Sequence, residues 1–139
     1  MRRDGIKMSK PIRLKTFQIG TPAKSGEGLR IAVTRRPPRG VPKADWKKVG
    51  CFDVWFPVLA PSTALLARRR NLNFEEASVR KAFFDSYEKA LLANADSRQA
   101  AALIAEIAAR IPVSIGCFCA DESRCHRSRL YKVILKLAE

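Results

Sequence analysis

The sequence predicts an α/β fold: a three-layer sandwich with a central, mainly parallel sheet of about four strands and helices on both faces. Short β-branched segments alternate along the chain with longer segments whose apolar residues recur at helical spacing. In the last quarter, a short apolar run, a polar loop and a helical pattern follow one another, which is typical of the βα units of parallel sheets. Because strand–helix–strand crossovers are right-handed, we expect helices on both faces of the sheet.

The length of 139 residues suits one domain with one core. We expect residues 1–12 to be a basic, flexible lead-in and residues 13–139 to be a single α/β domain. Apolar residues make up 47% of the chain and charged residues 29%, which excludes wholesale disorder. No apolar run approaches the roughly 20 residues of a membrane-spanning helix, and the start leads into no signal-peptide core. We therefore expect a cytoplasmic protein without a membrane partner.

Positive charge dominates the sequence and is concentrated in its first third. The 27 Lys and Arg against 13 Asp and Glu give a net charge of +14, and residues 1–48 alone carry +11. Such asymmetry favours a polyanionic partner, either a phosphate-containing ligand or nucleic acid. A basic surface without a specific partner is the alternative, because charge alone carries no specificity.

Two strands and a stiff loop are predicted in the first third. Residues 16–19 alternate polar and apolar and are followed by turn formers, and residues 29–34 form a β-branched run. The segment R-R-P-P-R-G at residues 35–40 must be a loop, since its two prolines forbid helix and remove ladder donors. Arginines on such a loop just past a strand are well placed to meet an anion; a solvated charge run is the competing interpretation.

The middle of the chain predicts a buried segment and three helices. Residues 52–58 are bulky and apolar apart from Asp53. Ser62 is an N-cap candidate for a helix to about residue 70. Capping-box patterns, in which an Asn or Asp precedes a Glu or Gln by three residues, then begin at Asn73 and Asp96. The apolar positions that we expect the two later helices to bury are Val79, Phe83, Tyr87 and Leu91, and then Leu103, Ile104, Ile107 and Ala108.

The last quarter predicts the position of the site. Residues 113–119 are a short apolar run that indicates a buried parallel strand, and residues 120–124 are a polar loop. A helix from about Cys125 has its buried stripe at Leu130, Val133, Ile134 and Leu137. Ligands of α/β proteins bind beyond the carboxyl end of a strand, against the N-terminus of the following helix.

Three of the four cysteines lie within nine residues, beside the single histidine. Cys117, Cys119, Cys125 and His126 cluster at the predicted strand end, whereas Cys51 is far off in the sequence and is expected to serve packing. This is no disulfide framework of a secreted mini-protein, and reduced thiols indicate nucleophile or metal chemistry instead.

Nucleophilic catalysis is the first chemical hypothesis. Cys119 or Cys125 would act as a thiolate, with His126 as acid or base and with Arg124 and Arg127 holding an anion bidentately. Helix N-termini lower the pKa of a thiol, which suits this role. Phosphatase-like and rhodanese-like enzymes use such a layout with five residues between Cys and Arg, and this spacing is not met here.

Zinc binding is the alternative. Cys117, Cys119, Cys125 and His126 supply three thiols and an imidazole, a sufficient set for a tetrahedral site. The spacing departs from the C-x2-C to C-x4-C of zinc knuckles, and neighbouring residues on a helix diverge by roughly 100°. A third interpretation has buried thiols and a His–Arg pair that binds an anion without catalysis. No cofactor and no oligomeric state is predicted.

Several ordered motifs resemble those of the domain of unknown function 488 family, which includes the YeaO-like proteins. They are R-I-x-V-x-R-x-x-P-R-G over residues 30–40, A-P-S-T-x-L over residues 60–65, and F-x-x-Y-x-x-x-L over residues 84–91. The segment from Cys117 through C-H-R-S at residues 125–128 is similar to the signature of a cysteine-bearing branch. The resemblance covers residues 28–135 and implies a small α/β domain, but no activity, because the family is named for lacking one.

Taken together, residues and resemblance predict an arginine-lined anion pocket at the carboxyl edge of the sheet. The ligand would be a phosphate, a nucleotide or a nucleic-acid end, and the pocket could be that of an enzyme or of a binding protein. A noncatalytic nucleic-acid-binding module that uses the basic first third is the rival class, with Trp46, Trp55 and Phe56 available to stack bases. The predicted anion-binding residues are Arg30, Arg35, Arg36, Arg39, Ser62, Arg124 and Arg127.

Overall fold

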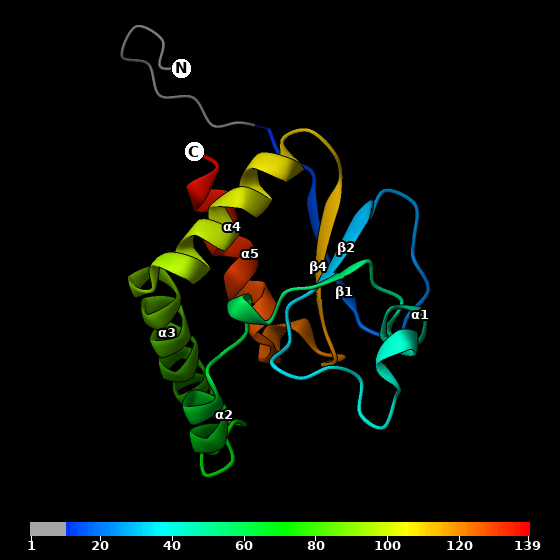
Figure 1. Ribbon diagram of the computed structural model, residues 1–139. Helices are drawn as coiled ribbons and strands as arrows, with labels where there is room; N and C mark the ends of the chain where they lie inside the picture. The colour runs from blue at the N-terminus through cyan, green and yellow to red at the C-terminus, as the bar shows by residue number, and fades with distance from the viewer. Residues whose placement is uncertain (1–10) are drawn as a thin grey trace, which may run out of the picture.

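The computed structural model describes residues 11–139 and places a four-stranded, all-parallel sheet in that part of the chain (Figure 1). The strands are β1 (Leu14–Gln18), β2 (Leu29–Ala32), β3 (Val54–Trp55) and β4 (Val113–Cys117), and their order in the sheet is β1-β4-β2-β3. The predicted α/β class and parallel sheet are confirmed. The predicted lead-in of residues 1–12 lies almost wholly outside the described residues.

Helices cover the two faces of the sheet unequally. The long helices α3 (Ala77–Ala93), α4 (Ala95–Ala108) and α5 (His126–Leu137) lie on one side, with α4 and α5 against the strands. The short α1 (Trp46–Gly50) lies on the other side, and α2 (Thr63–Arg69) extends beyond the sheet near the start of α3. Figure 1 shows the three long helices together on one side and α1 opposite them. The third layer is therefore thin: one short helix and the loops around it.

Each face of the sheet has its own apolar core, because side chains of a strand alternate between the faces. Ile31 and Ile115 point toward the long helices, as part of the larger core. Phe17 and Ala32 point toward α1 and pack with Phe52. The position after Ile115 is Gly116, where a Cβ would come within 2.3 Å of the Phe17 ring. The strand β4 therefore has glycine at the position where the Phe17 ring comes closest to its backbone.

The helix boundaries confirm one predicted cap and correct two. The Ser62 hydroxyl accepts a hydrogen bond from the Leu65 amide and caps α2, as predicted. Asn73 instead caps an isolated turn, accepting from the Glu75 amide, and α3 begins only at Ala77. The helix α4 is capped by Asn94, whose side chain accepts from two amides of the first turn, so the predicted start at Asp96 was two residues late.

Two burial predictions are wrong for a geometric reason. Leu103 was assigned to the buried stripe of α4, but it is 53% exposed, because the small side chains Ala101, Ala105 and Ala108 are the ones that let α4 approach the core. Val54 in the predicted buried segment is 40% exposed, since β3 is an edge strand of only two residues.

No helix within residues 11–139 is long and apolar enough to cross a membrane.

Candidate functional site

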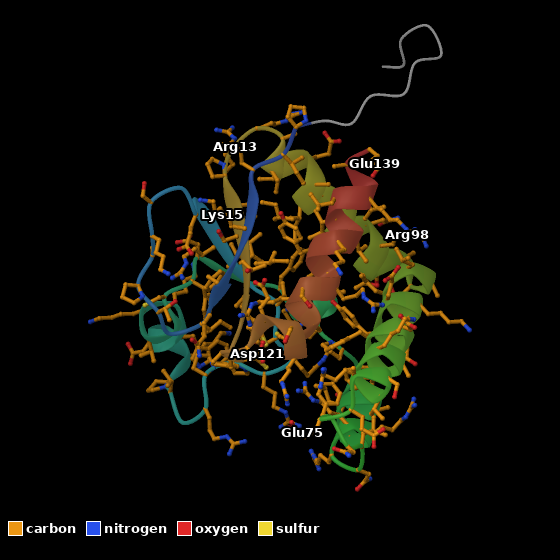
Figure 2. The ribbon with its side chains drawn as sticks, turned by 180° about the vertical axis from the view of Figure 1, so that it is seen from behind. Arg13, Lys15, Glu75, Arg98, Asp121 and Glu139 are labelled. Carbon is orange, nitrogen blue, oxygen red and sulfur yellow. The ribbon has the colours of Figure 1, made fainter. Side chains whose placement is uncertain are left out.

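The candidate site lies where the strands end. The loop after β2 (residues 33–42) and the loop after β4 (residues 118–125) leave the sheet at its carboxyl edge, since the strands are parallel. In Figure 2, Arg13 marks the amino end of the sheet, and Asp121 and Glu75 mark the opposite end, next to the start of α5. This is the edge at which the sequence analysis predicted ligand binding.

Three thiols and the imidazole form a compact, largely buried cluster at this edge. Nδ1 of His126 lies 4.0 Å from the Cys117 sulfur and 3.9 Å from the Cys125 sulfur, and all three residues are buried. Cys119 follows Cys117 by two residues and is half-buried, and its thiol interacts with the Cys117 and Cys125 thiols. Nε2 of His126 donates to the Val33 carbonyl oxygen at 2.7 Å, which fixes the tautomer and leaves Nδ1 facing the sulfurs.

The convergence of Cys125 and His126 depends on where α5 begins. The sequence analysis placed both residues on the helix, where their side chains would diverge. In the structure, Cys125 is the N-cap residue, with extended dihedral angles of φ −125° and ψ 143°, and His126 is the first helical residue. The change of backbone conformation between them turns both side chains toward Cys117.

Burial and neighbouring thiols set the protonation states of the cluster. Burial lowers the pKa of His126 to about 4, so its imidazole is neutral at neutral pH. Hydrogen bonds from the Cys117 and Cys125 thiols lower the pKa of Cys119 to about 2. Hydrogen bonds with the Cys117 and Cys119 thiols, together with burial, raise the pKa of Cys125. The first proton to leave the three-thiol cluster therefore leaves Cys119.

Two arginines bring positive charge to the cluster. Arg127 is 4% exposed and donates to the Cys119 carbonyl oxygen at 2.7 Å; its Nε lies 3.8 Å from a Glu122 oxygen and makes no hydrogen bond. Arg69, the last residue of α2, lies over the Phe74 ring at 4.0 Å, and its charge contributes to lowering the pKa of Cys119. Arg127 was predicted as a site residue; Arg69 was not.

A larger hollow lies beside the cluster. Its cavity volume is about 910 Å³, and its lining includes Arg36 and Arg39 from the loop after β2, Trp46 of α1, and Phe118 from the loop after β4. Both arginines are exposed, and among residues 11–139 neither guanidinium has a hydrogen-bond or ion-pair partner. Phe118 is 44% exposed. Guanidinium groups and aromatic rings thus share one concave surface.

Two indole N–H groups hold the loop that carries these arginines. Trp46 Nε1 donates to the Val41 carbonyl oxygen, and Trp55 Nε1 donates to the Thr34 carbonyl oxygen, both at 2.8 Å. The two indole rings pack edge to face, with centroids 5.3 Å apart. The Thr34 hydroxyl donates to the Arg36 carbonyl oxygen at 2.8 Å. With Pro37 and Pro38 in between, the loop is fixed at both ends before any ligand binds.

Arg35 and Ser62 line a different, smaller hollow of about 280 Å³ between the loop after β2 and α3. Arg35 donates to the carbonyl oxygens of Ala60 and Pro61 at 3.3 and 3.2 Å, and the Ser62 hydroxyl is engaged in capping α2. These contacts join the loop after β2 to the start of α2.

Arg30 and Arg124 lie away from both hollows. Arg30 is 3% exposed on the face covered by α1, where it donates to the Thr21 and Cys51 carbonyl oxygens. Arg124 forms a bidentate ion pair with Glu75, with N–O distances of 2.7 and 3.0 Å. The structure therefore divides the predicted set: Arg36 and Arg39 share a hollow, and the remaining predicted arginines are engaged by protein groups. A single pocket shared by all of them is not formed.

The hollow and the cluster meet at Phe118 and Cys119, consecutive residues of one loop. A family described as the active DUF488-N3 subclade matches residues 14–138. The chain belongs to this DUF488-N3a family. No curated protein and no solved structure matches it.

The match confirms the predicted DUF488 membership and extends over nearly the whole described chain. Assignment to a cysteine-bearing branch stays a prediction. Two residues of this DUF488 site were missed by sequence reasoning. Arg69 sits in a run of three arginines, where only the helix phase decides which one faces inward. Tyr87 was assigned to the core alone, yet its ring packs edge to face on His126 with centroids 5.4 Å apart.

Proposed function

We propose that the protein binds a phosphate-bearing ligand with a planar ring, of the nucleotide class, in the hollow lined by Arg36, Arg39, Trp46 and Phe118. The observation that carries this proposal is the combination on one concave surface of two aromatic side chains and two guanidinium groups that have no partner within residues 11–139.

The arginines suit the phosphate. A guanidinium presents a planar fork of donors that matches two phosphate oxygens, and such charge-assisted hydrogen bonds are roughly twice as strong as neutral ones. Arg36 and Arg39 stand three residues apart on a loop that two prolines and two indole N–H groups hold in place. Little conformational entropy is lost when such a loop binds, so more of the interaction energy is available as affinity.

The aromatic side chains suit the planar ring. Phe118 exposes 44% of its surface beside the hollow, although burial would be favourable for a phenyl group. Stacking of a base on an aromatic side chain contributes about 1–3 kcal/mol and tolerates different bases. The cavity volume of about 910 Å³ exceeds what inorganic phosphate needs and falls within the range of ligand pockets.

A ligand in the hollow would lie next to the thiol cluster. Catalysis by Cys119, Cys125 or His126 is a separate hypothesis. Cys125 is fully buried and both nitrogens of His126 face protein groups, so Cys119 is the member of the three that solvent can reach. The proposal therefore concerns binding.

Arg36→Ala/Arg39→Ala is expected to weaken binding of adenosine 5′-monophosphate by at least about tenfold, because each lost charge-assisted hydrogen bond contributes about 1.5–3 kcal/mol. The measurement is isothermal titration calorimetry of the full-length protein. Adenosine and inorganic phosphate, titrated separately, are each expected to bind more weakly than the monophosphate.

The matched control removes the same charge elsewhere. Lys89→Ala/Lys136→Ala takes two exposed positive charges from α3 and α5, and it is expected to leave the affinity unchanged. Equal weakening by both double variants would refute the hollow as the site. A short single-stranded oligonucleotide separates the rival nucleic-acid module: tight binding that falls steeply between about 50 and 200 mM salt, with no monophosphate binding, would replace the present proposal.

A further inference from the structure

We propose that Cys117, Cys119, Cys125 and His126 form a tetrahedral zinc site, in which three sulfur atoms and Nδ1 of the imidazole are the ligands. This site is distinct from the proposed nucleotide hollow and does not depend on it. Sequence spacing alone disfavoured it, and the arrangement of the side chains favours it.

The first argument is distance. Zinc bonds of about 2.3 Å to sulfur and about 2.0 Å to nitrogen place the sulfur and nitrogen ligands of a tetrahedral site about 3.5 Å apart. The observed Nδ1–sulfur distances are 4.0 Å to Cys117 and 3.9 Å to Cys125, and the ligand atoms of these three residues all lie within 4.8 Å of one another. Contraction by between a few tenths of an ångström and about one ångström would bring these three ligand atoms to tetrahedral separations. Cys119, from the same loop, would supply the fourth ligand.

The second argument is the orientation of the imidazole. Metal-ligating histidines almost always donate their other ring N–H to a carboxylate, a backbone carbonyl or water, which fixes the tautomer and the ring. His126 does this through Nε2, which donates to the Val33 carbonyl oxygen at 2.7 Å. The edge-to-face contact with Tyr87 holds the same ring from the side. The contacts with Val33 and Tyr87 therefore orient the ring so that Nδ1 faces the sulfurs, independently of any bond to a sulfur.

The third argument concerns the sulfurs. The Cys117 and Cys125 side chains are buried, at 7% and 0% exposure, and Cys119 adds a half-buried sulfur from the loop after β4. Closely placed sulfur and imidazole ligands that are shielded from solvent are typical of structural zinc sites, and cysteine binds the metal as the thiolate. The ligands come from the end of β4, the following loop and the start of α5, so one ion would fasten these three segments together.

The fourth argument is charge balance. Three thiolates and one Zn²⁺ leave the site with one net negative charge in a largely buried place, which needs a counter-charge. Arg127 directly follows His126 in α5 and is 4% exposed, and Arg69 of α2 reaches the backbone one residue before Cys125. Both guanidinium groups are held there by protein carbonyls: Arg69 donates to the Arg124 oxygen and Arg127 to the Cys119 oxygen.

The test is the metal content of full-length, tag-free protein purified without chelators, measured by inductively coupled plasma mass spectrometry. We expect about one zinc per chain. We expect Cys119→Ser and His126→Gln each to lower the zinc content at least fivefold. Cys119 is the least buried of the four proposed ligands. The matched control is Cys51→Ser, which removes the cysteine outside the cluster, at the end of α1, and should leave the content unchanged.

A second measurement does not depend on the folding of variants. Cobalt(II) added to metal-depleted wild-type protein should give the intense visible bands of a tetrahedral complex and a thiolate-to-cobalt charge-transfer band, and equimolar zinc should abolish both. Metal content below about 0.2 per chain without these bands, with the thiols shown to be reduced, would overturn the site. Fast alkylation of Cys119 alone in the same preparation would assign the cluster to a reactive thiolate instead. Iron in place of zinc would overturn the choice of metal.

Discussion

Arg30→Met is expected to lower the free energy of unfolding by about 3–5 kcal/mol, the usual cost of removing one partner from a buried ion pair. Arg30 and Glu27 are 3% and 6% exposed, and Nε of the arginine lies 3.2 Å from a carboxylate oxygen. The guanidinium also stacks on the Phe17 ring, 3.9 Å from its centroid. Loss of the arginine leaves the Glu27 carboxylate buried without its counter-charge. Urea denaturation followed by circular dichroism measures the effect.

A double variant separates the charge from the packing. Glu27→Gln in the Arg30→Met background should recover part of the lost stability, since the glutamine oxygen can still accept from the Lys24 amide and no unpaired charge remains. Folded Arg30→Met protein should bind adenosine 5′-monophosphate as the wild type does. If the variant instead lost affinity for the monophosphate without losing stability, Arg30 would be a ligand-binding residue, as the sequence analysis predicted.

Tyr87→Ala is expected to destabilise the protein by about 3–5 kcal/mol, as for other large aromatic residues in cores. Tyr87 is 2% exposed, and its hydroxyl donates to the Leu59 carbonyl oxygen at 2.6 Å. Burial, followed by the Cys125 and Cys117 thiols, raises the pKa of Tyr87, so the phenol keeps its proton and stays a donor. The measurement is again the free energy of unfolding from urea denaturation.

The other tyrosine provides the matched control. Tyr131 is half-buried on α5, and its replacement by alanine should cost clearly less. Tyr87→Phe keeps the ring on His126 and leaves the Leu59 carbonyl unsatisfied, at a cost of about 1–3 kcal/mol. If Tyr87→Phe lost as much stability as Tyr87→Ala, the ring of Tyr87 would contribute nothing to stability. Its contact would then not hold the His126 imidazole in place.

The sheet and the last helix were predictable because their signals are local. The β-branched run at β2 and the buried apolar run at β4 specify strands whatever surrounds them, and the stripe of α5 follows from spacing alone. The edge at which the site lies also follows from the order strand, loop, helix. These inferences need no knowledge of tertiary contacts.

The sequence could not predict which arginines lack a partner in the described part of the chain, because this depends on which carbonyls and carboxylates each side chain meets. Arg30 and Arg35 belong to one strand and its loop, yet the first faces the core under α1 and the second faces the start of α2. The thiol–imidazole geometry likewise depends on a helix that begins one residue later than expected, at His126. Sequence spacing cannot distinguish these cases, since one residue of shift reverses the direction of a side chain.

The most direct test of the proposed nucleotide site is a titration of ¹⁵N-labelled full-length protein with adenosine 5′-monophosphate, followed by NMR. The two indole N–H resonances are distinguished by Trp46→Phe. We predict saturable shifts of the Trp46 indole and of the backbone amides of residues 39–41 and Phe118, which line the hollow, with smaller shifts for Trp55. Shifts confined to the surfaces of α3 and α4, or no saturable shift at all, would contradict the account.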